Sequence, residues 1–153
     1  MKFWRISTFP DLTGRGGLLA NGRWHHAGRP VVYLADSPAS AMLEVLVHLE
    51  IDAEDIPDNL RLLRIETAND VHIEQIANLP DQWEERIEYT RALGDTWLAE
   101  NHSLLLQVPS AIMPHTANFL FNPLHPQAQQ ATLSVETLRL DRLELRTLHP
   151  TTD

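Results

Sequence analysis

The chain contains no cysteine among its 153 residues, which excludes a disulfide framework, thiol catalysis and cysteine-ligated metal sites. It has no run of about 18 apolar residues, and the N-terminal MKFWR lacks the apolar core of a signal peptide. Basic residues are few, with 12 Lys and Arg against 21 Asp and Glu and a formal charge of −9. Because gripping a phosphate backbone requires a basic face, direct nucleic-acid binding is not expected. These features predict a cytoplasmic protein that does not bind membranes.

The composition, 43% hydrophobic and 22% charged, predicts one globular domain over residues 1–153. Hydrophobic patterning predicts a mixed α+β fold with more strand than helix. Strands are expected at 3–7, 30–35, 60–66 and 104–108, with one or two more within 131–148. Helices are expected from 37 to about 49 or 50 and over 87–101, the second weakened by Gly94. Residues 69–86 are expected to form loops with a short helix.

A glycine-rich polar segment covers residues 11–28, and such a segment is expected to supply backbone freedom near a binding site instead of core. It carries Arg23 between Gly22 and Trp24. An arginine in a flexible loop can form two hydrogen bonds to a phosphate or carboxylate. The alternative is a surface arginine that stacks on Trp24.

The clearest helix begins at Ser37-Pro38, because serine caps free N–H groups and proline suits the first helical position. Its expected core face is formed by residues at helical spacing, namely Met42, Val45, Leu46 and Leu49.

Two polar features adjoin this predicted core. Tyr33 lies in an apolar strand, where its ring offers a face for a planar ligand, or where it is an ordinary core tyrosine. Glu44 and His48 lie four residues apart on one helix stripe beside the core face. A carboxylate at such a border can be partly desolvated, as a catalytic group would be, or the two residues form a solvated pair.

Further polar candidates follow the strand at 104–108. Ser110 comes directly after that strand, and Asn118 and Asn122 offer amide groups within an apolar run. Asn122-Pro123 could equally form a turn without a ligand. A serine hydrolase is disfavoured, because Ser110 lacks a Gly-x-Ser-x-Gly elbow. A metal site is not expected either, since His25 and His26 are adjacent and no known metal-binding motif occurs.

Together these segments resemble the RES-domain toxins of Xre–RES type II toxin–antitoxin systems. The matching stretches are Trp4-Arg5-Ile6, residues 22–33, residues 44–49, Val108-Pro109-Ser110 and residues 118–126. The Arg, Glu and Ser that name the domain fall at Arg23, Glu44 and Ser110. His25 departs from the pattern, because many members carry Asn there.

The resemblance implies an ADP-ribosyltransferase-like fold and destruction of cellular NAD+, by hydrolysis or phosphorolysis of the nicotinamide–ribose bond. NAD+ is then a substrate, and no resident cofactor is expected. The implied catalytic residues are Arg23, Tyr33, Glu44 and Ser110. The implied NAD-binding residues are Arg23, Tyr33, Ser110, Asn118 and Asn122.

The family also implies neutralisation by a Xre-family helix-turn-helix antitoxin. Two other functions stay open, namely a protein ADP-ribosyltransferase with the same pocket and a non-catalytic module that binds a nucleotide or a partner. The sequence also leaves open the acceptor of the reaction, a homodimeric state, and the roles of His25 and His48.

Overall fold

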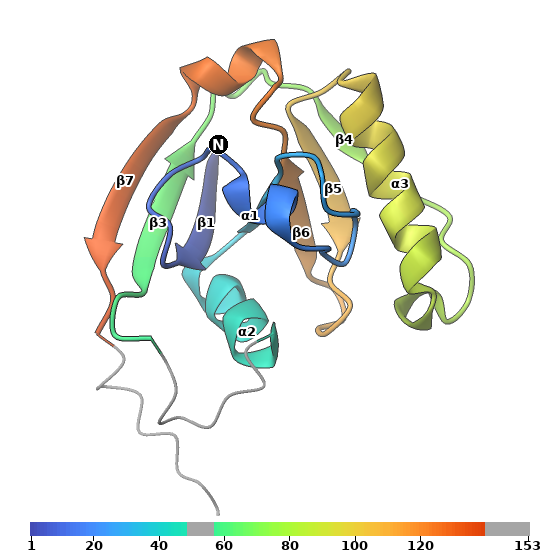
Figure 1. Cartoon of the computed structure of the whole chain (residues 1–153), viewed down its shortest axis with the longest axis horizontal. Coiled ribbons are helices and arrows are strands. Elements are labelled where there is room, and N and C mark those ends of the chain that lie inside the picture. Colours follow the sequence, from blue (N-terminus) through green and yellow to red (C-terminus); the bar gives the residue numbers. More distant parts are fainter. Residues whose placement is uncertain (49–56, 140–153) are drawn as a thin grey trace, which may run out of the picture.

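The computed structural model describes residues 1–48 and 57–139. A seven-stranded sheet lies at its centre, in the order β4-β5-β6-β2-β1-β3-β7 (Figure 1). The strands are β1 (Lys2–Ser7), β2 (Val32–Ala35), β3 (Arg61–Glu66), β4 (Ile73–Gln75), β5 (Leu105–Pro109), β6 (Ala117–Phe121) and β7 (Thr132–Thr137). The helices are α1 (Arg15–Leu19), α2 (Pro38–His48) and α3 (Ile87–Glu100), with short 3₁₀ helices η2 (Trp83–Glu85) and η3 (Pro126–Gln130). The predicted mixed α+β class is confirmed.

The sheet register brings distant parts of the chain into one row. β4 and β5 run parallel, and the other described neighbours run antiparallel. Ala35 of β2 pairs with Trp4 of β1 on one side and with Asn118 of β6 on the other, and Asn118 in turn pairs with Val108 of β5. Asn118 therefore lies in the middle of the sheet.

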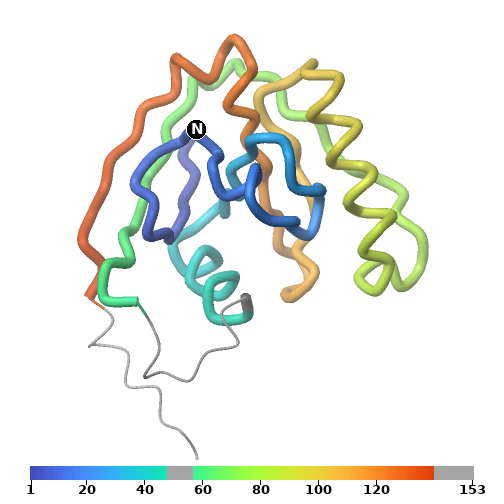
Figure 2. Tube along the Cα trace, in the orientation of Figure 1, coloured from blue at the N-terminus to red at the C-terminus, as the bar shows by residue number. Residues whose placement is uncertain are grey.

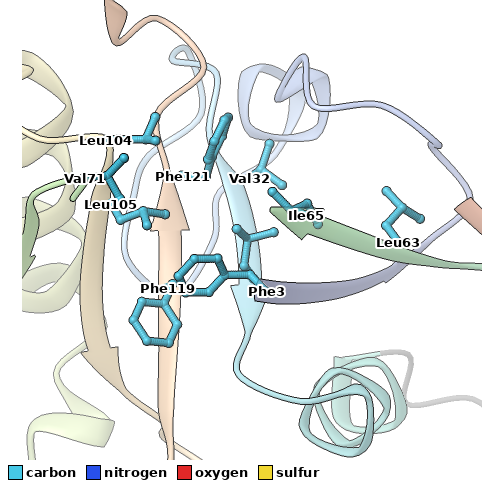
Figure 3. Close-up of a cluster of buried hydrophobic side chains, with 10 residues drawn as sticks. Phe3, Val32, Leu63, Ile65, Val71, Leu104, Leu105, Phe119 and Phe121 are labelled. Atoms are coloured by element: carbon cyan, nitrogen blue, oxygen red, sulfur yellow. The ribbon is translucent and has the colours of Figure 1, made fainter. Parts of the chain in front are cut away.

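Alternation along the strands gives the sheet two apolar faces. On one face, Val32 and Leu34 join a cluster in which the rings of Phe3 and Phe119 meet edge to face, with centroids 4.8 Å apart (Figure 3). On the other face, Tyr33 packs against a cluster with residues of α3, and Ala35 belongs to a cluster with residues of α2. The second face therefore carries both long helices.

Helix α2 begins as predicted, since the N–H of Ser40 donates to Ser37 Oγ at 3.1 Å. Met42 and Val45 pack against the sheet, as expected. Leu46 does not, with 37% of its surface exposed, because the face that meets the sheet is centred on Ala41 and Val45. Leu49 and the predicted end of the helix lie outside the described residues.

The expectation that segment 11–28 contributes no core is wrong. It forms α1 and then crosses the sheet towards α3 (Figure 2). Trp24 and His25 are buried, and Trp24 joins the cluster beneath α3. The physical reason is a tight turn that directs a large aromatic side chain inward, which composition alone does not reveal.

The remaining expectations are met in part. The strand at 60–66, the helix at 87–101 and a strand within 131–148 correspond to β3, α3 and β7. Residues 69–86 contain the short helix η2, but also β4, which was not predicted because it has three residues and gains its partner only from β5. In the described part of the chain, no helix is long and apolar enough to cross a membrane.

Candidate active site

A tight turn carries Arg23 at its corner. The N–H of Gly22 donates to the C=O of His25 at 3.1 Å, which leaves Arg23 and Trp24 at the bend. Trp24 is buried, with its ring centroid 5.6 Å from that of Trp83. Arg23 stays partly exposed, and its guanidinium donates to a backbone carbonyl of η2. The turn thus separates an anchoring aromatic residue from a cation near the surface.

One face of α3 holds the backbone of this turn. The hydroxyl of Thr90 donates to the C=O of Arg23 at 2.7 Å, and Nε of Arg91 donates to the C=O of Gly22 at 2.8 Å. These contacts join residues 67 and 69 positions apart in the chain. The position of Arg23 is therefore fixed by a helix that sequence analysis did not connect with it.

The next turn of α3 also contacts this segment, at Trp24 and His26. Gly94 lies so close to the C=O of Trp24 that a Cβ at this position would overlap it. Asp95 accepts the N–H of His26 at 2.9 Å and lies 2.5 Å from its Nδ1, while Nε2 of His26 lies 2.8 Å from Glu88. The hydrogen bonds to Asp95 and Glu88 raise the pKa of His26. Glycine inside a helix was the one sequence signal for this packing.

Tyr33 points its hydroxyl into the same turn. It accepts the N–H of Trp24 at 3.1 Å and lies 2.7 Å from Nδ1 of His25. Burial raises the pKa of the Tyr33 phenol far above its ordinary value, so the group is neutral at physiological pH. Arg5 donates to the backbone C=O of Tyr33 at 3.3 Å, and burial lowers the pKa of this arginine. Arg5 is a second cation near Tyr33 to which the sequence assigned no role.

Glu44 of α2 meets two of the other predicted residues. Its Oε1 accepts hydrogen bonds from Nδ2 of Asn118 at 2.8 Å and from the hydroxyl of Ser110 at 3.3 Å. The Ser110 oxygen also accepts the N–H groups of Ile112 and Met113, each at 3.1 Å. The hydroxyl proton is therefore directed at the carboxylate, and this hydrogen bond helps to orient Glu44.

Asn118 keeps one polar atom unused. Its Oδ1 is buried and has no hydrogen-bond partner among the described residues. Turning the amide over would place that oxygen against the Glu44 carboxylate, which repels it, so the assignment with Nδ2 on Glu44 is the stable one. A buried acceptor without a partner is costly, and a ligand N–H or O–H would satisfy it.

The side chains of Tyr33 and Asn118 lie on the same face of the sheet. Tyr33 pairs with Leu120 and Ala35 pairs with Asn118, so Tyr33 and Asn118 are diagonal neighbours on the same face. Such neighbours lie about 7–8 Å apart, within reach of long side chains. Four predicted residues and the turn that bears Arg23 are thus brought to one region.

One predicted residue, Asn122, lies outside this group. Asn122 is buried in the turn after β6, where Nδ2 donates to Asn101 Oδ1 at 2.7 Å and Oδ1 accepts the N–H of Leu124 at 3.0 Å. These bonds give it a structural place, and its contact with NAD+ stays a prediction. The side chain of His48 lies outside the described part of the structure.

Other features of the described residues lie apart from the group. A hollow of about 600 Å³ lies between β4, β5 and α3, and none of the predicted site residues lines it. No cluster of three or more His, Asp and Glu side chains able to hold a metal occurs within residues 1–48 and 57–139.

The structure is that of an α+β protein in which Ser110 and Asn118 bind the carboxylate of Glu44 from α2, beside the sheet face that bears Tyr33. The chain belongs to the RES domain family, whose model matches residues 2–142.

Curated relatives extend over most of the chain. It is 57% identical to "Toxin Res" of Pseudomonas putida over 141 residues, which are 92% of this chain and 97% of the relative. It is 37% identical to "Prs ADP-ribosylating toxin" of Sphingobium sp., with 84% of this chain and 86% of the relative covered. The fold also resembles that in the crystal structure of the M. tuberculosis MbcT–MbcA toxin–antitoxin complex, with a TM-score of 0.75, 19% identity, and coverage of 92% and 85%.

Proposed function

We propose that this protein is the toxin of a toxin–antitoxin system and that it depletes NAD+ by cleaving the nicotinamide–ribose bond. The observation that carries the proposal is a carboxylate, Glu44, held by Ser110 and Asn118 on the sheet face that also bears Tyr33. Two relatives support it, because one is named a toxin and the other an ADP-ribosylating toxin. ADP-ribosylation breaks the same bond of NAD+.

The chemistry requires stabilisation of a cation. When the bond between C1′ of the ribose and the pyridine nitrogen breaks, its electron pair stays with nicotinamide, which leaves as a neutral base. The ribose keeps an oxocarbenium-like positive charge, as in glycoside hydrolysis. Water or phosphate then adds at C1′, and with water a proton passes to solvent. Little acid catalysis is needed, so the main demand is a negative charge near C1′.

Glu44 meets this demand in the proposal, either at the cation itself or through a ribose hydroxyl. Hydrogen bonds from Asn118 and Ser110 fix its carboxylate, so it does not have to reorganise as charge develops. Removing a preorganised group of this kind typically costs about 2.7–4 kcal/mol of transition-state stabilisation, or roughly 100- to 1,000-fold in rate.

The other residues bind the dinucleotide. Arg23 clamps the pyrophosphate, and its five N–H donors allow both the present bond to η2 and a contact to phosphate. Tyr33 stacks on nicotinamide. Ser110 hydrogen-bonds the nicotinamide ribose or its phosphate, and for this its hydroxyl turns away from Glu44. The unpartnered Oδ1 of Asn118 accepts a donor from the ligand, with Asn122 as the less favoured alternative. NAD+ is consumed as substrate, without a resident cofactor.

The test is nicotinamide release from NAD+ by the purified protein, with the second product identified by mass spectrometry. The protein should release nicotinamide, and Glu44→Gln, which keeps the size and the acceptor oxygen, should nearly abolish release. Glu136→Gln is the matched control, because Glu136 is exposed on the edge strand β7. A wild-type protein that leaves NAD+ intact, both alone and with added cell lysate, refutes the activity and favours a non-catalytic binding module.

A second candidate is transfer of ADP-ribose to a protein, which the name of the Sphingobium relative favours. Both activities use the same carboxylate, so the variants do not separate them. The products do, because hydrolysis or phosphorolysis yields free ADP-ribose or its phosphate, whereas transfer yields a protein adduct.

We also propose a Xre-family helix-turn-helix antitoxin as partner, supported by the solved toxin–antitoxin complex with this fold. With a formal charge of −9, the toxin is suited to attract a basic protein, so binding of operator DNA falls to the partner. Co-expression with the neighbouring gene product should relieve growth arrest and yield a complex on size-exclusion chromatography. Arrest that persists despite formation of that complex contradicts neutralisation by binding.

A further inference from the structure

His25 is the buried titratable group that the proposed chemistry leaves without a role. Only 2% of its surface is exposed. Its Nδ1 lies 2.7 Å from the Tyr33 hydroxyl, and its Nε2 lies 3.1 Å from the C=O of Gly17 in α1. The ring therefore connects the helix α1 to the phenol through two hydrogen bonds.

The direction of each bond follows from the partners. The C=O of Gly17 can only accept, so Nε2 carries the hydrogen. In a neutral imidazole the other nitrogen is then an acceptor, and Nδ1 receives the hydroxyl proton of Tyr33. The oxygen of the Tyr33 hydroxyl also accepts the N–H of Trp24. The hydroxyl therefore accepts from Trp24 and donates its proton to His25.

We propose that His25 is a positioning residue that fixes the ring and hydroxyl of Tyr33 for NAD+ by accepting the phenol proton at Nδ1. This inference rests on the proposed function, in which Tyr33 stacks on nicotinamide. Gly22 packs closely against both side chains, because a Cβ at this position would lie 2.7 Å from Cζ of Tyr33 and 2.8 Å from Nδ1 of His25. The two side chains therefore have little room to move.

The surroundings keep His25 neutral. Burial lowers its pKa, and the charged residues Asp95 and Arg91 of α3 act on it with opposite signs. Protonation of His25 would place a hydrogen on Nδ1 and remove the acceptor. Activity should therefore fall only as the pH drops below the ordinary histidine pKa of 6.5.

Two variants separate the halves of this connection. In His25→Asn the amide oxygen can occupy the place of Nδ1 and accept from Tyr33, but it cannot reach Gly17. In His25→Gln the amide nitrogen can occupy the place of Nε2 and keep the bond to Gly17, while the phenol proton loses its acceptor. Each variant thus keeps one hydrogen bond of the wild type and loses the other.

We expect His25→Asn to keep kcat/KM for NAD+ within about threefold of the wild type, and His25→Gln to lose roughly 10- to 100-fold, mainly through a higher KM. His25→Asn should also lose the decline in activity at acid pH. A merely structural histidine predicts similar losses in both variants, and that result overturns the inference. If the wild type releases no nicotinamide, the proposed function has failed instead.

A measurement without NAD+ tests the geometry. The ¹⁵N chemical shifts of His25 should show hydrogen on Nε2 and an unprotonated Nδ1 near pH 7, and Tyr33→Phe should move the Nδ1 signal by removing its donor. A hydrogen found on Nδ1 overturns the inference, whatever the enzyme does.

Discussion

Replacing Gly94 by alanine should destabilise the protein, although the same change favours an ordinary helix. By helix propensity alone, alanine is preferred to glycine by about 0.8–1.0 kcal/mol in a helix interior. At this position, however, a Cβ would overlap the C=O of Trp24. Inserting atoms into a packed site costs about 1–3 kcal/mol, and the upper end applies because the neighbour is backbone and cannot rotate away.

The net loss is then about 2 kcal/mol, which lowers the Tm of a chain of this length by about 4–8 °C. Thermal unfolding followed by circular dichroism measures it. Gly16→Ala is the matched control, since a Cβ on Gly16 of α1 meets nothing within 4 Å, and its Tm should stay or rise. A Tm for Gly94→Ala equal to or above that of the wild type refutes the close packing of α3 on the turn that carries Arg23.

Two further predictions concern charge. Asn118→Asp places a carboxylate where an amide now donates to Glu44 at 2.8 Å. The two acids should then share a proton, and nicotinamide release at pH 7 should fall at least tenfold. Unchanged release contradicts the contact between Asn118 and Glu44. His26 has a pKa raised by Asp95 and Glu88, so its contribution to stability is complete below its unfolded pKa of about 6.5 and is lost as the pH rises through the higher folded value. The difference in free energy of unfolding between wild type and His26→Ala should therefore shrink from pH 6 upward, and a constant difference speaks against the ion pair.

Much of the fold follows from local patterns, and so does the choice of several candidate site residues. Ser37-Pro38 and the apolar spacing after it predict α2, and the border position of Glu44 marks it as a candidate. Its partners Ser110 and Asn118 are separate candidates in the sequence, Ser110 because it follows a predicted strand and Asn118 because it is an amide within an apolar run. No local pattern predicts that the three side chains meet, because Ser110 lies 66 positions and Asn118 lies 74 positions after Glu44 in the chain.

Strands β4 and β6 were not predicted, and both pair with strands from distant parts of the chain. Strand β4 has three residues and gains its identity from pairing with β5. The burial of His25 depends on Gly17 and Tyr33, and the fixed turn before it depends on Thr90 of α3. Gly94 indicates that something packs closely on α3, but a glycine inside a helix does not identify the neighbouring segment.

The central claim, that Glu44 stabilises charge on the ribose as the nicotinamide bond breaks, is tested most directly by measuring NAD+ binding and single-turnover cleavage in the wild type and in Glu44→Gln. The dissociation constant for NAD+ should change by no more than a few-fold, while the cleavage rate falls roughly 100- to 1,000-fold. Cleavage at the wild-type rate by Glu44→Gln, with NAD+ bound equally well, would contradict the account.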